Sequence, residues 1–297
     1  MSESMPTDLA EAPTPSFYDR GKTLTVRVEF VRQLRRRRTI IAFAVGVVLP
    51  LIVVAAVKLG PSSSSGNGGG FGGGELDLVG LATAGAWNFS LTMLFFGAGF
   101  LLTIIAAMFL GDSVASEASW STLRYLLAAP VPRRRLLRAK ALVGLLLTAI
   151  TLLILVGASW IIGALAFGTT PLVSPLGASF DVTESWVRLA IVAGYIMIVL
   201  LIPAGLGFLM SVLTDVPLGA VGAAVVIIIV LNILDAIEAL GSVRNFLPGE
   251  YANAWVGALG SSVDWETMAK GTAYSLVLFG IFVLIATLRF DRKDITS

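Results

Sequence analysis

The sequence predicts an all-α polytopic membrane protein with six transmembrane helices. Of its 297 residues, 56% are apolar and only 13% are charged, whereas about 25% of the residues are charged in an ordinary soluble domain. Six apolar stretches are each about 18 residues or longer, which is the length needed to cross the hydrocarbon core of a bilayer. The lysines and arginines are concentrated on one predicted side of these stretches, as expected of a membrane protein.

The six expected spans cover residues 39–57, 89–110, 141–167, 189–213, 217–234 and 271–288. The second lies in a charge-free stretch bounded by Asp77 and Asp112, and the third in one bounded by Lys140 and Asp181. The fifth is uncharged only over residues 216–234, but residues 225–231 are too apolar for an exposed helix. The first follows a long basic segment and precedes no small-residue cleavage pattern, so we expect it to remain in the mature protein.

The basic residues predict the orientation of the chain. Of the 21 lysines and arginines, 17 lie before the first span, between the second and third spans, or after the sixth. Basic residues close to a span resist translocation, so we expect these three segments to be cytoplasmic. An even number of spans agrees with this placement. The chain is therefore expected in the plasma membrane, with both termini in the cytoplasm.

The cytoplasmic N-terminal segment has two predicted parts. Residues 1–16 contain prolines, serines and acids without an apolar face, which is typical of a disordered tail. Residues 17–38 place apolar side chains on one side of a helix and polar ones on the other, which predicts an amphipathic helix in the membrane interface. Its last residues also fit a simple cytoplasmic anchor, and both roles stay open. The anchor residues are Arg35, Arg36, Arg37 and Arg38.

Several classes of enzyme are excluded by composition. The chain has no cysteine and no histidine, so it contains no thiolate nucleophile, disulfide or imidazole base. Gly21-Lys22-Thr23 resembles the end of a phosphate-binding loop, but Ser16 stands where the first glycine is required. We therefore expect a protein that is not an enzyme, with no cofactor or metal site of its own. The net charge of +2 gives no reason to expect a nucleic-acid partner.

The spans and external segments carry little chemistry. Spans two, three and four contain no charged residue, which disfavours a proton-coupled carrier. Residues 61–74 are rich in glycine and serine and predict a flexible external loop. Residues 235–270 are too polar to cross the membrane and too apolar for a free loop, so they predict a short re-entrant external segment. Within it, we interpret Asp235 and Glu238 as solvated charges at a helix end, with a cation site as the alternative.

The cytoplasmic segment 111–140 has the strongest pattern. Trp120, Leu123, Leu126 and Leu127 recur at helical spacing, so a short amphipathic helix can bury one stripe of side chains. Two prolines then end this helix, and five basic residues follow before the third span. On these grounds alone, a helix on the membrane surface is the competing interpretation. A second cytoplasmic turn, 214–217, is short; we expect Asp215 to cap the helix that begins at Pro217.

These residues resemble the cytoplasmic loop of type-2 ATP-binding-cassette (ABC) exporter permeases. That loop has the pattern E-x-x-x-G-T-L-x-x-L-L-x-x-P-x-x-R and ends in a lysine before the third span. The matching residues are Glu117, Ser121-Thr122-Leu123, Leu126-Leu127, Pro130, Arg133 and Lys140. Ser121 departs from the pattern, since glycine is usual there. The motif is confined to this segment, but the order of lead-in helix, six spans and long external segment extends the resemblance over most of the chain.

The resemblance implies the permease subunit of an ABC exporter, with residues 39–290 as one membrane domain and 291–297 as a cytoplasmic tail. Residues 117–127 would be the coupling helix that docks on a separate ATPase dimer, which binds ATP and Mg²⁺. The implied contacts are Glu117, Trp120, Ser121, Thr122, Leu123, Arg124, Leu126, Leu127, Pro130 and Arg133, with Asp215 as a second, smaller contact. A second permease copy or sister permease and membrane lipid complete the partners. The alternative is an ATP-independent channel or carrier, or a scaffold.

Overall fold

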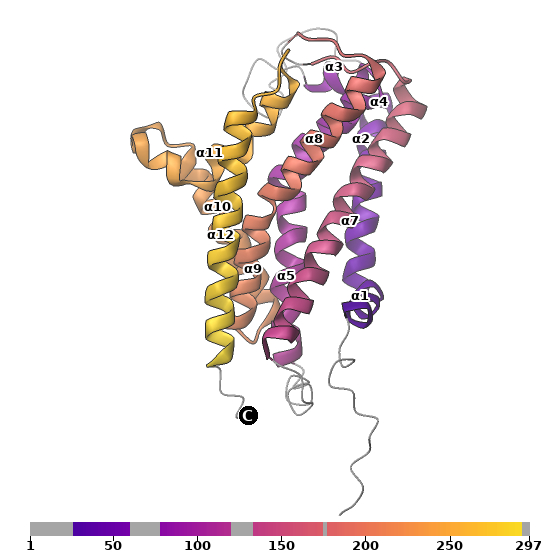
Figure 1. Ribbon diagram of the computed structural model, residues 1–297. Coiled ribbons are helices and arrows are strands. Elements are labelled where there is room, and N and C mark those ends of the chain that lie inside the picture. Colours follow the sequence, from indigo (N-terminus) through magenta and orange to yellow (C-terminus); the bar gives the residue numbers. More distant parts are fainter. Residues whose placement is uncertain (1–25, 60–77, 120–132, 175–176, 293–297) are drawn as a thin grey trace, which may run out of the picture.

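A computed structural model describes residues 26–59, 78–119, 133–174 and 177–292, and this part of the chain is almost entirely helical (Figure 1). The α-helices are α1 (Val26–Leu34), α2 (Arg37–Leu59), α3 (Leu78–Thr83), α4 (Ala86–Phe96), α5 (Leu102–Ser119), α7 (Arg133–Phe167), α8 (Val182–Val199), α9 (Leu201–Leu213), α10 (Pro217–Asp235), α11 (Pro248–Ala252) and α12 (Trp265–Asp291). A π-helical segment, η1 (Gly97–Leu101), joins α4 to α5, and η2 (Glu238–Phe246) and η3 (Ala254–Leu259) are 3₁₀-helical.

Six helices within the described residues are long and apolar enough to cross a membrane. They are Arg37–Leu59, Ala86–Ser119, Arg134–Phe167, Val182–Leu213, Pro217–Asp235 and Trp265–Asp291. Each contains one of the spans predicted from hydropathy, so the six-span architecture is confirmed. The second, third, fourth and sixth helices extend well beyond the predicted spans. Polar turns continue them, because a helix satisfies its own backbone hydrogen bonds on either side of the hydrocarbon boundary.

Two of the long helices are irregular near the middle. In the second, the Thr103 hydroxyl donates a hydrogen bond to the Ala98 carbonyl at 3.0 Å, next to the π-helical turn η1. In the fourth, α8 ends and α9 begins around Leu200, three residues before Pro203. Proline removes a backbone donor and crowds the preceding turn, which explains a break at this point. Both irregularities face the cavity described below.

The centre of the bundle is built on close contacts between α5 and its neighbours α7, α9 and α10. Small residues permit these contacts, since Ala106, Ala107 and Ala204 are fully buried. At Gly207 in α9, a β-carbon would lie only 2.7 Å from the carbonyl oxygen of Ala107 in α5. The two helix backbones are therefore closer there than any side chain larger than hydrogen would allow.

The helix ends sort into two groups (Figure 1). The helix α1, the end of α5, the start of α7 and the end of α12 lie together at one end of the bundle. We call this the basic end, because the arginines that precede α2 and those that begin α7 are there. After α10, the exposed segment η2 projects sideways from the bundle, below the level at which α8 and α12 begin, whereas η3 packs against α8 and α12.

Candidate functional site

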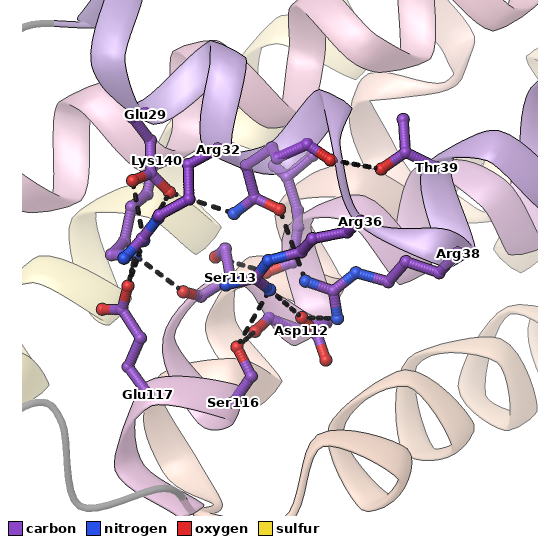
Figure 2. A network of polar contacts seen from close by, with 12 residues as sticks. Glu29, Arg32, Arg36, Arg38, Thr39, Asp112, Ser113, Ser116, Glu117 and Lys140 are labelled. Carbon is purple, nitrogen blue, oxygen red and sulfur yellow. Dashed lines mark hydrogen bonds and ion pairs between the residues drawn. The ribbon is translucent and has the colours of Figure 1, made fainter.

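A buried polar network lies at the basic end, where α1, α2, α5 and α7 meet (Figure 2). The consecutive helices α1 and α2 contribute side chains to it, together with the distant helices α5 and α7. The members are Glu29, Arg32 and Gln33 from α1, Arg36 from the junction, Arg38 and Thr39 from α2, Asp112, Ser113, Ser116 and Glu117 from α5, and Lys140 from α7. In an otherwise apolar bundle, this cluster of charges is the strongest candidate for a functional site.

Lys140 is at the centre of the network. It is 1% exposed, and its Nζ lies 2.6 Å from Oε1 of Glu117 and 3.5 Å from Oε1 of Glu29. The same ammonium donates a hydrogen bond to the backbone carbonyl of Ser113 at 3.0 Å. A buried charge is tolerated only when it is paired and hydrogen-bonded. Lys140 therefore holds α1 and the end of α5 against the start of α7.

Arg32 closes the network from the other side. Its Nη2 lies 2.7 Å from Oε2 of Glu29, and the same guanidinium forms an ion pair with Glu117. Gln33 donates to Oε1 of Glu29 at 3.0 Å. The two buried carboxylates are thus shared between two cations, of which Lys140 is buried and Arg32 is 40% exposed.

The orientation of α1 follows from these contacts. Glu29 and Gln33 are buried against the bundle, whereas Val28 is 62% exposed and Val31 is 40% exposed. The sequence predicts a polar and an apolar side for α1, and the structure turns Glu29 and Gln33 inward, while Phe30 and Leu34 also pack against the bundle. Lys140 of α7 offers a partner to Glu29, and the outward valines face the surroundings of the bundle.

Asp112 forms a second group of contacts next to the first. Arg36 donates to Oδ2 of Asp112 at 3.1 Å and to the Ser116 hydroxyl at 3.4 Å, and Arg38 forms an ion pair with the same carboxylate. Arg38 also donates to Oε1 of Gln33 at 3.3 Å, which links this group to the Lys140 group. The result is a continuous set of contacts from the α1–α2 junction to the last turns of α5.

The charges of the network shift the pKa of its members that lie outside the spans. Burial alone would raise the pKa of Glu29, but Lys140 and Arg32 outweigh this effect and hold the pKa below its ordinary value. Burial alone would lower the pKa of Arg32, yet the hydrogen bond to Glu29 and the charge of Glu117 raise it. Burial and the neighbouring Arg32 lower the pKa of Arg36. Glu29 is therefore ionised at neutral pH despite its burial.

We expect the contribution of Glu29 to stability to disappear in acid. Its pKa is lower in the folded protein than in the unfolded chain, where a glutamate has a pKa of about 4.3. The ionised carboxylate therefore favours folding above that pH, and this advantage is lost as the pH falls through the folded-state pKa. At neutral pH, Glu29→Gln should lower the free energy of unfolding by roughly 1–3 kcal/mol. Thermal unfolding in detergent should show the wild type and the variant converging in acid; a constant difference would contradict the assignment.

The opposite end of the bundle is held by a separate set of polar contacts. Asn88 in α4 donates to the carbonyl of Val173 at 2.6 Å and accepts from the amide of Val173 at 3.0 Å. Arg188 in α8 is 6% exposed, donates to the carbonyl of Ala258 in η3 at 2.7 Å and lies 4.7 Å above the ring of Phe180. Ser174 donates to the carbonyl of Leu259 at 2.7 Å. These contacts fasten the loop after α7 and the segment η3 onto α4 and α8.

A cavity of about 310 Å³ lies between these two polar regions. Its lining comes from α4, η1, α5, α8, α9 and α10, with α11 and η3 on one side. Phe95, Phe96, Phe100 and Trp255 supply aromatic surface, and polar atoms come from Thr103, Asn232 and Asn253. A largely apolar cavity with a few polar groups fits an amphiphilic small molecule.

The family model described as "Protein of unknown function (DUF2705)" matches residues 76–296, which contain α3 to α12. The chain belongs to the DUF2705 family. No curated protein matches it. The matched part of this DUF2705 chain includes Asp112, Glu117 and Lys140, whereas their partners on α1 and α2 precede it.

The structure places only part of the coupling segment predicted for this DUF2705 chain. Glu117 lies in the last turns of α5, is 3% exposed and pairs with Arg32 and Lys140. Arg133 begins α7. The remaining predicted residues, Trp120, Ser121, Thr122, Leu123, Arg124, Leu126, Leu127 and Pro130, lie outside the described residues.

Two further predictions, for the anchor arginines and for the Asp215 cap, can be compared with the structure. Of the four anchor arginines, Arg36 and Arg38 pair with Asp112, while Arg35 and Arg37 are exposed. The expectation that Asp215 caps α10 is wrong. Val216 takes the N-cap position, and the Thr214 hydroxyl accepts a hydrogen bond from the Val216 amide at 3.2 Å. Pro217 does begin α10, as expected from its fixed backbone angle.

Sequence reasoning missed the pairing of Glu29, Arg32 and Lys140 across α1, α5 and α7. One signal could have indicated it. Glu29 is the only acid between residues 20 and 38, in a segment with eight basic residues. An isolated acid among so many basic residues is expected to form an ion pair. The sequence does not say which distant cation is its partner.

Proposed function

We propose that this chain is the membrane-spanning permease subunit of an ABC transporter, working as an exporter with a separate cytoplasmic ATPase. The observation that carries the proposal is the position of Glu117 and Lys140. They lie on either side of residues 120–132, which hold most of the ABC-like motif, and their charged atoms are 2.6 Å apart. A force applied to that segment would reach α5 and α7 together through a buried ion pair.

The network extends this connection to α1 and α2. Arg32 contacts Glu117, and Arg36 and Arg38 contact Asp112, five residues earlier in α5. Because buried pairs are costly to separate, the four helices move as a unit at the basic end. In the proposed mechanism, ATP-driven closure of the ATPase dimer displaces the coupling segment, and this unit transmits the displacement to the spans.

The cavity between α4, η1, α8, α9 and α10 supplies a place for cargo. Its aromatic lining and few polar groups suit an amphiphilic or hydrophobic molecule such as a lipid, peptide or drug. The π-helical turn η1 lies in its wall, and π-helical turns occur frequently at functional sites. In this proposal η2, α11 and η3 form a re-entrant segment on the outer side, and α1 lies in the cytoplasmic interface of the plasma membrane.

The test is purification of the tagged chain from native membranes in mild detergent, followed by mass spectrometry. We expect a protein with nucleotide-binding motifs at near-equal amount and ATP hydrolysis in the eluate. Arg124→Glu reverses a charge on the proposed docking helix and should lower the amount of co-purified ATPase about tenfold or more. Lys58→Glu makes the same charge change at the exposed far end of α2 and serves as the matched control.

The opposite result would remove the proposal. Repeated purification without any nucleotide-binding protein, from membranes in which the neighbouring genes are expressed, would favour an ATP-independent channel or carrier, or a scaffold. Equal recovery of the ATPase with Arg124→Glu and Lys58→Glu would instead remove the docking role of residues 117–127.

A further inference from the structure

A groove of about 560 Å³ lies between the ends of α9 and α12, away from the ion-pair network. Small-molecule sites commonly have volumes of about 300–1,000 Å³, so the groove is large enough to hold part of a ligand. It is lined by Val212 and Leu213 from α9, by Ile285, Leu288 and Arg289 from α12, and by Arg292, which directly follows α12.

The α12 side of the groove has a clear gradient along one helix face. Residues 285, 288, 289 and 292 are spaced as i, i+3, i+4 and i+7, so they form one stripe. The stripe begins with Ile285 and Leu288, which are 39% and 48% exposed, and ends with two exposed arginines, Arg289 in the last turn and Arg292 at the C-cap. Apolar surface thus leads directly to two positive charges at the basic end.

The arginines have no acidic partner among the residues that the structure describes. The nearest acid in sequence, Asp291, has its Oδ2 3.1 Å from Nε of Arg134 in α7. Its charge is therefore engaged outside the groove. Arg289 and Arg292 keep their charges available to a ligand, next to an apolar surface that is open to the outside.

We propose that this groove binds an anionic phospholipid of the leaflet at the basic end. Its acyl chain would lie against Val212, Leu213, Ile285 and Leu288, and its phosphate would pair with Arg289 and Arg292. The charge of the arginines complements an anionic headgroup, and guanidinium groups bind phosphate in a bidentate manner. Basic pockets between transmembrane helices are recognised sites for anionic headgroups. A zwitterionic lipid, whose headgroup has no net charge, would bind less well.

The absence of cysteine from the chain permits a site-specific test. Leu284→Cys, at an exposed position directly before the lining residue Ile285, carries a fluorophore in the full-length protein reconstituted in phosphatidylcholine vesicles. Nitroxide-labelled phosphatidylglycerol or nitroxide-labelled phosphatidylcholine is added, and quenching by the two lipids is compared. The reference reporter is Leu218→Cys, at the exposed start of α10, where no arginine lies within the same turn.

We expect phosphatidylglycerol to quench the reporter at position 284 preferentially, whereas the two lipids should quench the reporter at position 218 about equally. The preference should fall about fivefold for each arginine removed, and Arg289→Gln with Arg292→Gln should abolish it. Raising the salt concentration should weaken it in the unaltered groove, because exposed charges are screened.

A matched control separates a site from general surface charge. Arg35→Gln with Arg37→Gln removes two exposed arginines from the same end of the bundle and should leave the preference at position 284 unchanged. Equal loss of preference in both double variants would overturn the proposal, as would equal quenching by the two lipids in the unaltered groove. If the α12 double variant does not insert, the salt dependence decides; a preference insensitive to salt contradicts a charged headgroup site.

Discussion

Replacing Lys140 by methionine should lower the free energy of unfolding by roughly 3–5 kcal/mol, the largest loss that we expect from a single change. Methionine fills a similar volume but leaves Glu29 and Glu117 buried near each other, with only the partly exposed Arg32 to compensate both. The carbonyl of Ser113 also loses its donor. Thermal unfolding of the purified protein in detergent, followed by circular dichroism, measures the effect.

A second change tests whether charge is the cause. Lys140→Met combined with Glu117→Gln removes one cation and one anion together, and Arg32 can then compensate Glu29 alone. We expect the double variant to be more stable than Lys140→Met, since the energies of paired groups are not additive. A double variant that is as unstable as the single one would assign the loss to packing. A fully stable Lys140→Met would contradict the network itself.

Gly207→Ala is the second change with a large expected effect. The added β-carbon would lie 2.7 Å from the carbonyl oxygen and 3.1 Å from the Cα of Ala107, and backbone atoms cannot turn away as a side chain can. The helices α5 and α9 must separate, which also disturbs Ala106 and Ala204 in the buried contact. Overpacking of this kind costs about 1–3 kcal/mol, and the unfolding temperature should fall accordingly.

The matched control for this change is Gly222→Ala in α10. A β-carbon there meets no atom within 4 Å, so the substitution adds a methyl group to open space. Because alanine is a better helix former than glycine, Gly222→Ala should be neutral or slightly stabilising. Equal destabilisation by both variants would show that the close approach of α5 and α9 is not what Gly207 provides.

The six spans could be predicted because hydropathy acts on each segment independently of the rest of the chain. A stretch such as residues 141–167 has to leave water whatever its neighbours are, so its own composition predicts a membrane helix. The uneven distribution of arginine and lysine predicts an orientation in the same way, since basic residues close to a span resist translocation whatever the rest of the chain does. Even the weaker fifth span was correctly predicted, since α10 covers Pro217–Asp235.

Helix boundaries and caps were less predictable. The second predicted span ended at residue 110, but α5 continues to Ser119, because Asp112 and Glu117 find partners on other helices and need not face water. The predicted Asp215 cap is also wrong, because α10 begins one residue later than a cap at Asp215 requires. Val216 occupies the N-cap position without a side-chain cap, and the Thr214 hydroxyl accepts the hydrogen bond of the Val216 amide.

The sequence by itself determined that this chain is an apolar helical protein with six helices long enough to span a membrane and most of its positive charges in three segments between or beyond them, since these properties depend on each segment alone. Only the tertiary structure decided that Glu29 and Gln33 of α1 turn inward, that Glu29, Glu117 and Lys140 meet, and that the cavity lies between α4, η1, α8, α9 and α10. Such pairings depend on how helices rotate and pack against one another. Uncharged spans leave those rotations open, and buried charges fix them because a misplaced charge would remain without a partner.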